Sequence, residues 1–485
     1  MLTGLLCLAV FFVMALAMYG RRISALLALP LMAIAIALIG GVEGKVIVKD
    51  VLSGGAVKLH NAYTATMFGA MLAELVNKHG MARSLVRFVA EFAGDNPYLL
   101  GVFLTLVTAL LFSTLGGLGA VIMVGTIILP VMLSLGIPAL CAAGLFLFGI
   151  SLGGMFNLTN WQLYTDVLKI DQPTIISFVV PFSLILGLVI LLFLLIELKK
   201  KGNLLYFLGG LLCLSALYVP LSGYNPVSTQ NSSAGATATA GANASANASA
   251  NASAAGADIY TYSLYFVLAL IAYAFYRAFS KKESMPAISL LTPVVPLVFV
   301  LFLHWDIIPA FMMGITYGVL TTWKKDSVNI LTRAIIDGTA NVIPAVLLMM
   351  GIGMLITAVM DKGVSEAIAP LIKAVVPSTP LMYILGFTML APFALYRGPL
   401  SLWGMGSGLV TLVVNLTTLS AQSVMSMLMS VGQVQGVCDP TNTQNIWIAT
   451  YLGVDTQVIL KKTLPYAMLA ALLGLSLAVL KGFVH

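Results

Sequence analysis

Charged residues are scarce in this 485-residue sequence. They make up 8% of the chain, whereas 60% of the residues are hydrophobic and the mean hydropathy is +1.04. A soluble domain carries about 25% charged residues. Apolar runs long enough to cross a hydrocarbon core of roughly 30 Å as helices recur from end to end. The composition therefore argues against a soluble protein and predicts an all-α polytopic membrane protein.

Other residue types and motifs are also missing. The sequence has four histidines and no His-rich or multi-carboxylate cluster, so we expect no catalytic residues, no metal site, no cofactor and no enzyme activity. It has no nucleotide-binding loop, which argues against transport driven by ATP. The cysteines show no metal-like spacing and are predicted to be unpaired. They are Cys7, Cys141, Cys213 and Cys438.

The net charge of +7 comes from short basic clusters that follow apolar runs. This pattern sets orientation in a bilayer and does not indicate nucleic-acid binding. The clusters are Arg21-Arg22, Lys199-Lys200-Lys201, Arg277 with Lys281-Lys282, and Lys324-Lys325. With all of them in the cytoplasm, the Asn-, Ala- and Ser-rich loop 223–257 lies on the extracytoplasmic side. Its composition predicts a disordered segment. We expect a multi-pass protein of the plasma (inner) membrane.

The two halves of the sequence match each other at a shift of 281 to 284 residues. Met71-Leu72 meets Met354-Leu355, and Phe112 meets Phe393. The pattern Thr159-Asn160-Trp161-Gln162 meets Thr441-Asn442-Thr443-Gln444. With the orientation above, the first copy starts outside and the second starts inside. This predicts two inverted-topology repeats, an arrangement typical of secondary transporters.

Four segments follow from this reading. They are N-terminal scaffold helices (1–49), a first inverted repeat (50–201), linking helices with the loop (202–332) and a second inverted repeat (333–485). Outside the repeats, helices are predicted at about 2–18, 23–42, 203–222, 260–276, 288–304 and 307–322. In the first repeat they are predicted at about 61–77, 80–92, 98–112, 120–135, from 139 onward, and 173–198.

Each repeat is predicted to contain a re-entrant hairpin and a broken transmembrane helix. Three glycines at 116, 117 and 119 favour a hairpin tip at 113–119, and the second tip is expected at 396–401. The first broken helix is expected to be interrupted at Gly153-Gly154, and Asp439-Pro440 interrupts its counterpart, because proline removes a backbone donor. Matching breaks in two repeats point to the substrate site of a transporter.

Polar residues at these tips and breaks are the candidate binding residues. Arg397 is a cation at the second tip, and a guanidinium suits a carboxylate group; the alternative is that it extends to the lipid headgroups. The amides and hydroxyls at the breaks suit carboxylate or sodium, or else they satisfy freed backbone groups. The predicted substrate-binding residues are Asn157, Thr159, Asn160, Gly117, Arg397, Gly398, Ser401, Thr441 and Asn442.

A coupling-ion site is expected beside them. Asp439 is the candidate to carry a proton or to bind sodium, or it pairs with Arg397. Thr443, Gln444 and Asn445 are its candidate neighbours. Glu74 lies near a span end close to Lys78, which favours an ion pair at the rim over a coupling role.

At these residues the chain resembles the citrate–metal:proton symporter family of the ion transporter superfamily, and more distantly the gluconate-type permeases. The likeness rests on residues 21–29, the tip 113–119, and the segments 152–171 and 431–455, within about 1–200 and 285–485. It implies two re-entrant hairpins and two broken helices around a substrate site, with a scaffold for dimerisation and elevator-like movement. Members of that family carry acidic residues in the first tip, and this chain has none there, which counts against a metal–citrate complex as cargo.

The function expected from the sequence is secondary active transport of a small organic anion, a citrate-like, di- or monocarboxylate, coupled to a proton or sodium gradient. The alternative is a cation/proton antiporter of the same superfamily. The expected partners are the carboxylate substrate, the lipid bilayer and a second copy of the chain, without nucleic acid.

Overall fold

The computed structural model describes residues 2–19, 22–94, 96–198, 203–222, 286–377, 379–398, 400–403 and 406–484, together with a few isolated positions between 265 and 276. The described residues form helices and no strands, as predicted. Loop 223–257, most of the predicted helix 260–276, and the basic residues 199–201, 277, 281 and 282 lie outside the described residues. All four cysteines are free, as expected.

The first half of the chain contains the N-terminal helices and the first predicted repeat. The N-terminal helices are α1 (Leu2–Tyr19), α2 (Ala25–Ile39), α3 (Gly44–Val46), the π-helical η1 (Ile47–Gly54) and α4 (Gly55–Val57). The repeat follows as α5 (His60–Lys78), α6 (Met81–Ala93), α7 (Pro97–Phe112), α8 (Gly117–Ser134), α9 (Ala139–Met155), α10 (Leu158–Leu168) and α11 (Gln172–Leu198).

The second predicted repeat has the same order of elements. It contains α16 (Ser327–Val359), α17 (Lys362–Val375), α18 (Pro380–Leu390) with η3 (Ala391–Arg397), α19 (Gly406–Leu416), α20 (Ala421–Cys438), α21 (Thr443–Leu452) and α22 (Thr456–Leu480). In both series a long helix, a short amphipathic helix, two hairpin arms, two halves of a broken helix and a final helix follow one another. This shared order supports the duplication, while the opposite orientation of the two copies in a membrane stays a prediction.

The helices between the repeats are α12 (Asn203–Ser222), η2 (Ala287–Leu291), α14 (Val295–Leu303) and α15 (Ile307–Thr321). The single helix predicted at 288–304 is wrong: a turn at 292–294 divides it into η2 and α14. Pro293 lies within this turn, and it has no backbone N–H to donate into a continuing helix. Pro296 lies in the first turn of α14, where such an N–H would have no intrahelical acceptor. The hydroxyl of Thr292 donates to the backbone oxygen of Ser289 (2.6 Å) and so satisfies one carbonyl at the end of η2.

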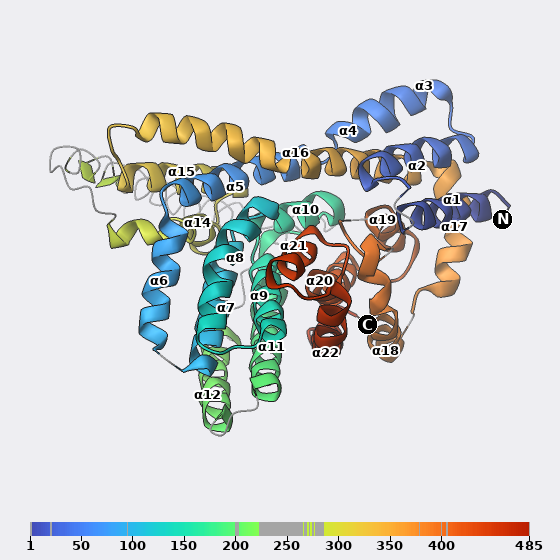
Figure 1. The fold of residues 1–485 in the computed structure, drawn as a ribbon. Coiled ribbons are helices and arrows are strands. Elements are labelled where there is room, and N and C mark those ends of the chain that lie inside the picture. The colour runs from blue at the N-terminus through green and yellow to red at the C-terminus, as the bar shows by residue number, and fades with distance from the viewer. Residues whose placement is uncertain are drawn as a thin grey trace, which may run out of the picture.

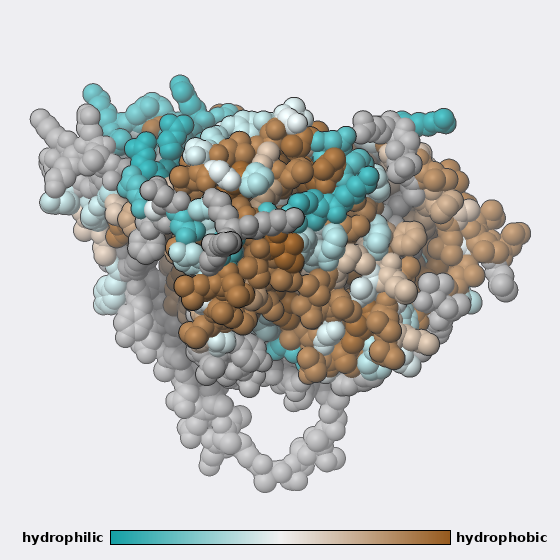
Figure 2. All heavy atoms as spheres, turned by 60° about the horizontal axis from the view of Figure 1, so that its bottom comes forward, coloured by the Kyte–Doolittle hydropathy of each residue, from teal (hydrophilic) through white to brown (hydrophobic). Residues whose placement is uncertain are grey.

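Several described helices are long and apolar enough to cross a membrane. These are α8, α11, α16 and α22, and α9 with α10 forms a fifth candidate span that is bent by 51°. In Figure 1, α7, α8, α9, α11 and α12 run side by side, and α16 crosses above them next to α5 and α2. Figure 2 shows apolar side chains over much of the described surface of one face, with hydrophilic side chains concentrated toward its upper part.

The two hairpins differ at their tips. The first is tight: α7 ends at Phe112, and α8 begins at Gly117, whose φ of +82° is easily reached only by glycine. The second tip runs from the irregular η3 to the start of α19 at Gly406, and Tyr396 within it has a φ of +58°. A Cβ atom at Gly398 would lie 2.0 Å from the oxygen of Phe393, so this tip folds back tightly on η3.

Candidate functional site

The first broken helix is interrupted two residues later than predicted. α9 continues through Gly153 and Gly154 to Met155, and the chain leaves the helix at Phe156 and Asn157. The two glycines do not break the helix; Gly153 instead allows a close approach of α7, because a Cβ atom there would lie 2.4 Å from the oxygen of Ala109. The prediction of a break at Gly153-Gly154 is therefore corrected, and close packing explains the first glycine.

Asn157 and Asp439, at the two breaks, each make the same pair of hydrogen bonds with the threonine two residues later. Asn157 Oδ1 accepts hydrogen bonds from Thr159 N (3.0 Å) and Thr159 Oγ1 (2.5 Å). Asp439 Oδ1 accepts from Thr441 N (2.9 Å) and Thr441 Oγ1 (2.6 Å). Both residues are buried, with 6% of Asn157 and 0% of Asp439 exposed. The two repeats therefore share one turn geometry, built with an amide in the first and a carboxylate in the second. In the first repeat this turn caps α10, whereas α21 begins only at Thr443 and has no side-chain cap.

The amides that follow the breaks satisfy the carbonyl groups left free at the ends of α9 and α20. In the first repeat, Asn160 Nδ2 donates to Gly154 O (2.8 Å) and the buried Trp161 donates from Nε1 to Met155 O (2.7 Å). The same role in the second repeat belongs to Asn442, Gln444 and Asn445, which donate to the oxygens of Gln435, Gly436 and Val437 (2.9, 3.0 and 2.9 Å). These side chains hold the broken helices together.

Asn157 also joins the broken helix to the first hairpin tip. Its Nδ2 donates to the backbone oxygens of Phe112 (2.9 Å) and Leu115 (3.1 Å). Since its oxygen caps Thr159, the whole amide is used within the protein. Asn157 therefore fixes the position of the tip relative to α10.

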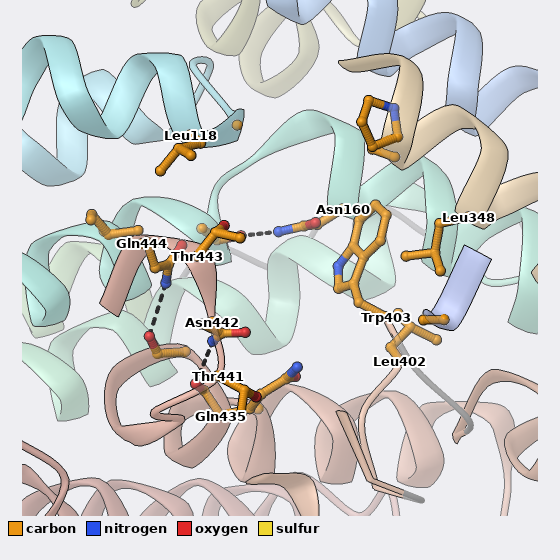
Figure 3. Close-up of a pocket in the computed structure, with 18 of the residues that line it drawn as sticks. Leu118, Asn160, Leu348, Leu402, Trp403, Gln435, Thr441, Asn442, Thr443 and Gln444 are labelled. Atoms are coloured by element: carbon orange, nitrogen blue, oxygen red, sulfur yellow. Dashed lines mark hydrogen bonds between the residues drawn. The ribbon is translucent and has the colours of Figure 1, made fainter. Parts of the chain in front are cut away.

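The tips and breaks surround two adjoining cavities. The large cavity has a volume of about 1300 Å³ and the small one about 310 Å³. The predicted site residues that line one or both are Gly117, Asn157, Thr159, Asn160, Thr441, Asn442, Thr443 and Gln444. Figure 3 shows Asn160, Asn442, Thr443 and Gln444 from the two broken helices close to Leu118 of the first tip and Trp403 of the second.

Three other predicted site residues, Asp439, Asn445 and Ser401, are buried and lie behind this lining. Asp439 and Asn445 are buried (0% and 2% exposed) and do not line either cavity, and Asn445 Oδ1 has no hydrogen-bond partner among the described residues. Ser401 Oγ donates to Gln435 Oε1 (2.8 Å), and this bond links the second tip to α20. The backbone of Arg397 ends η3, but its side chain lies outside the described residues.

The structure adds lining residues that the sequence analysis missed. Asn341 of α16 lines both cavities and donates from Nδ2 to Glu74 Oε1 of α5 (2.9 Å). Lys78 pairs with Asp337 (2.6 Å), so the expected ion pair between Lys78 and Glu74 is wrong. A lone asparagine inside the apolar stretch before Pro344 was the sequence signal for this position.

Gln433 is a second lining residue that the sequence analysis missed. It lies on α20, and its Oε1 accepts a hydrogen bond from Ser151 Oγ of α9 (2.7 Å). Its Nε2 donates to the backbone oxygen of Met429 (3.1 Å), so both ends of this amide are used within the protein. Gln433 therefore connects the two broken helices in the wall of the large cavity.

No protein-family model matches the chain, and no curated protein matches it. Among solved structures, the chain is similar to the crystal structure of the YdaH transporter of Alcanivorax borkumensis, which is described as having an unusual topology. The two chains share 15% sequence identity, the alignment covers 90% of this chain and 87% of that chain, and the TM-score is 0.46.

Proposed function

We propose that this protein is a secondary carrier for a small organic anion. The observation that carries the proposal is the convergence of the first hairpin tip and both broken helices on one cavity. Gly117, Asn160 and Asn442 line it from these three elements. Non-helical backbone at membrane depth is tolerated where it borders protein or a water-filled cavity, and transporters place their substrates at such breaks.

The backbone around the cavity favours an anion. No side chain caps the first turn of α8, which starts at Gly117, or that of α21, which starts at Thr443, and both starting residues line the large cavity. The first N–H groups of a helix lack intrahelical partners, and the helix dipole makes this end positive. Anions bind well at such ends.

Charged side chains support the same conclusion. Among the described residues, no aspartate or glutamate lines either cavity. Arg397 at the second tip adds a cation to this region of the sequence, and its guanidinium suits a carboxylate. A site for exchanging cations would need anionic ligands in the cavity, so the geometry favours the organic anion over the antiporter alternative.

Coupling to a proton or sodium gradient is part of the proposal. Asp439 and Asn445 place carboxylate and amide oxygens directly behind the lining residues Thr441 and Gln444. A multi-pass location in the plasma membrane and assembly as a homodimer are proposed with it. Both are consistent with the apolar outer surface.

Uptake into proteoliposomes tests the proposal. Purified protein is reconstituted, and the accumulation of radiolabelled mono-, di- and tricarboxylates is measured with an imposed proton gradient, with a sodium gradient and with neither. We expect at least one acid to accumulate under one of the two gradients. Absence of accumulation and of exchange for every acid, together with sodium–proton exchange by the same vesicles, would instead support the antiporter.

A further inference from the structure

Four amide side chains in the cavity lining are turned the same way. In each of them, the side-chain NH2 group donates a hydrogen bond to a protein oxygen that can only accept one. For Asn160, Asn442 and Gln444 the acceptors are the backbone oxygens at the ends of α9 and α20. For Asn341 the acceptor is the Glu74 carboxylate. An amide whose nitrogen must face such an acceptor cannot be reversed without losing the bond, so its oxygen lies on the opposite side.

The side-chain oxygens of these four amides are therefore available to accept hydrogen bonds from a solute in the cavity. None of them accepts a hydrogen bond from the part of the chain that the structure describes, and all four residues line the large cavity. Figure 3 shows the nitrogen atoms of Asn160 and Asn442 at their dashed bonds, with the oxygen atoms pointing away from them. An acceptor that loses its hydrogen bond to water without gaining another donor destabilises the bound state. A bound solute that displaces this water must therefore bring donors.

Asn341 is held in its orientation by a different kind of group from the other three amides. It projects from α16, and the group that fixes it is a side chain and not a freed backbone carbonyl. Lys78, one turn beyond Glu74 on α5, is paired with Asp337, which leaves the carboxylate of Glu74 to Asn341. The pair lies against the first turn of α8, because a Cβ atom at Gly119 would be 3.4 Å from Asn341 Nδ2 and 3.9 Å from Glu74 Oε1.

We propose that the substrate carries hydrogen-bond donors, hydroxyl or ammonium groups, beside its anionic group, and that Asn341 is a residue that selects for them. This inference rests on the proposed transport of an organic anion. The uncapped helix ends receive the anionic group, and the amide oxygens receive the donors. Glu74 acts through Asn341 as a positioning residue: an ionised carboxylate only accepts hydrogen bonds, so it keeps the oxygen of Asn341 turned to the cavity.

Matched pairs of acids test the inference. Uptake of malate is compared with succinate, of lactate with propionate, and of aspartate with succinate, in proteoliposomes containing the whole protein. A site built to bind a hydroxyl or amino group discriminates strongly against the analogue that lacks it. We expect at least one donor-bearing acid to be taken up about 10-fold or more faster than its partner, which is the effect of about one hydrogen bond.

Variants of Asn341 and Glu74 test whether these two residues produce the preference for donor-bearing acids. Asn341→Leu is expected to lower the ratio of uptake within the preferred pair several-fold, and Asn341→Ser, which keeps an acceptor, to restore part of it. In Glu74→Gln the side chain at position 74 can donate a hydrogen bond as well as accept one. This variant should therefore lower the uptake ratio within the preferred pair without abolishing uptake of the acid that lacks the donor. The control is Asn329→Leu: Asn329 is on the same helix and also donates to a carboxylate, that of Asp326 (2.6 Å), but lines neither cavity.

A merely structural role of Asn341 would change the uptake of both acids equally and leave their ratio unchanged, and that result would overturn the assignment. Equal uptake within every pair by the wild-type protein would overturn the inference while leaving the proposed function standing. A third contrary result would combine two observations: the wild-type protein shows no preference for donor-bearing acids, and Asn341→Leu raises the sodium concentration needed for uptake. That result would assign the amide oxygens to a cation site. Failure to transport any acid would overturn the proposed function itself.

Discussion

Ser151 and Gln433 occupy equivalent positions in the two halves of the sequence, 282 residues apart, and they are hydrogen-bonded to each other at 2.7 Å. Asn157 and Asp439, which form matching turns at the two breaks, are separated by the same interval. When two copies of a unit are related by a two-fold axis, a residue can meet its own equivalent at that axis. The contact supports an axis between α9 and α20, beside the large cavity, as expected for inverted repeats.

The adjacent glycines near the end of α9 allow a direct test of the packing between α7 and α9. Gly153→Ala places a methyl group where the backbone oxygen of Ala109 would be 2.4 Å away, whereas the nearest atom to a Cβ at Gly154 is 3.9 Å away. We expect Gly153→Ala to destabilise the fold by about 1–3 kcal/mol, as overpacking does. Gly154→Ala should be neutral or slightly stabilising, since alanine favours a helix over glycine. Thermal unfolding in detergent measures both, and equal melting temperatures would contradict the packing described here.

The turn geometry shared by Asn157 and Asp439 makes Asp439→Asn an informative substitution. The amide of Asn157 already makes the same contacts to Thr159 in the first repeat, so we expect Asp439→Asn to keep the contacts to Thr441 and a melting temperature within a few degrees of wild type. If a proton drives transport at Asp439, this variant should lose gradient-driven accumulation yet retain exchange of substrate. Asp439→Leu, which removes both contacts to Thr441, is the destabilised comparison, because a lost hydrogen bond costs about 1 kcal/mol. Full accumulation by Asp439→Asn would place the coupling proton elsewhere.

Sodium coupling predicts a different pattern at the same break. Thr441→Ala or Asn442→Ala should then raise the sodium concentration needed for half-maximal uptake, since each removes an oxygen near Asp439. The measurement is the sodium dependence of initial uptake rates, with Thr450→Ala as control because the Thr450 hydroxyl donates to Ile446 O of its own helix (2.8 Å) and the residue lines neither cavity. Unchanged sodium dependence in both variants would remove these residues from the ion site.

Arg397 at the second tip is predicted to bind the anionic group of the substrate. Arg397→Lys keeps the charge but loses the two-pronged geometry of the guanidinium. We expect a several-fold to 10-fold weaker apparent affinity, and near-complete loss of uptake in Arg397→Gln. Both are measured as the KM and maximal rate of uptake, and wild-type values in the two variants together would refute the assignment.

His79, at the end of α5, provides a pH-dependent contribution to stability outside the predicted spans. Burial, and then the nearby Lys324, lowers the pKa of His79. A base whose pKa is lowered on folding binds more protons when unfolded, so stability falls as the pH drops through its ordinary value of about 6.5. We expect the melting temperature to decrease between about pH 8 and pH 5.5, and the decrease to be smaller in His79→Gln. The same pH dependence in wild type and variant would show that other groups are responsible.

The sequence by itself determined the class of the protein and the order of its helices. Long apolar runs, the glycines near 117 and the proline after Asp439 act through local physics, namely the length needed to cross a bilayer and the limits on backbone torsion. For that reason α5, α7 and α11 begin and end within one or two residues of their predicted limits. The glycine pair at 153–154 was misread because a glycine that permits close packing and one that ends a helix look alike in a sequence.

Only the tertiary structure decided which atoms of the polar residues face the cavity. The amide of Asn157 is consumed by backbone oxygens 42 and 45 residues earlier, and that of Asn341 is oriented by a glutamate 267 residues away. No local pattern specifies such contacts, because they depend on how α5, α8 and α16 pack together. The sequence identified the breaks where amides gather, and the fold turned their nitrogens to the protein and left their oxygens to the cavity.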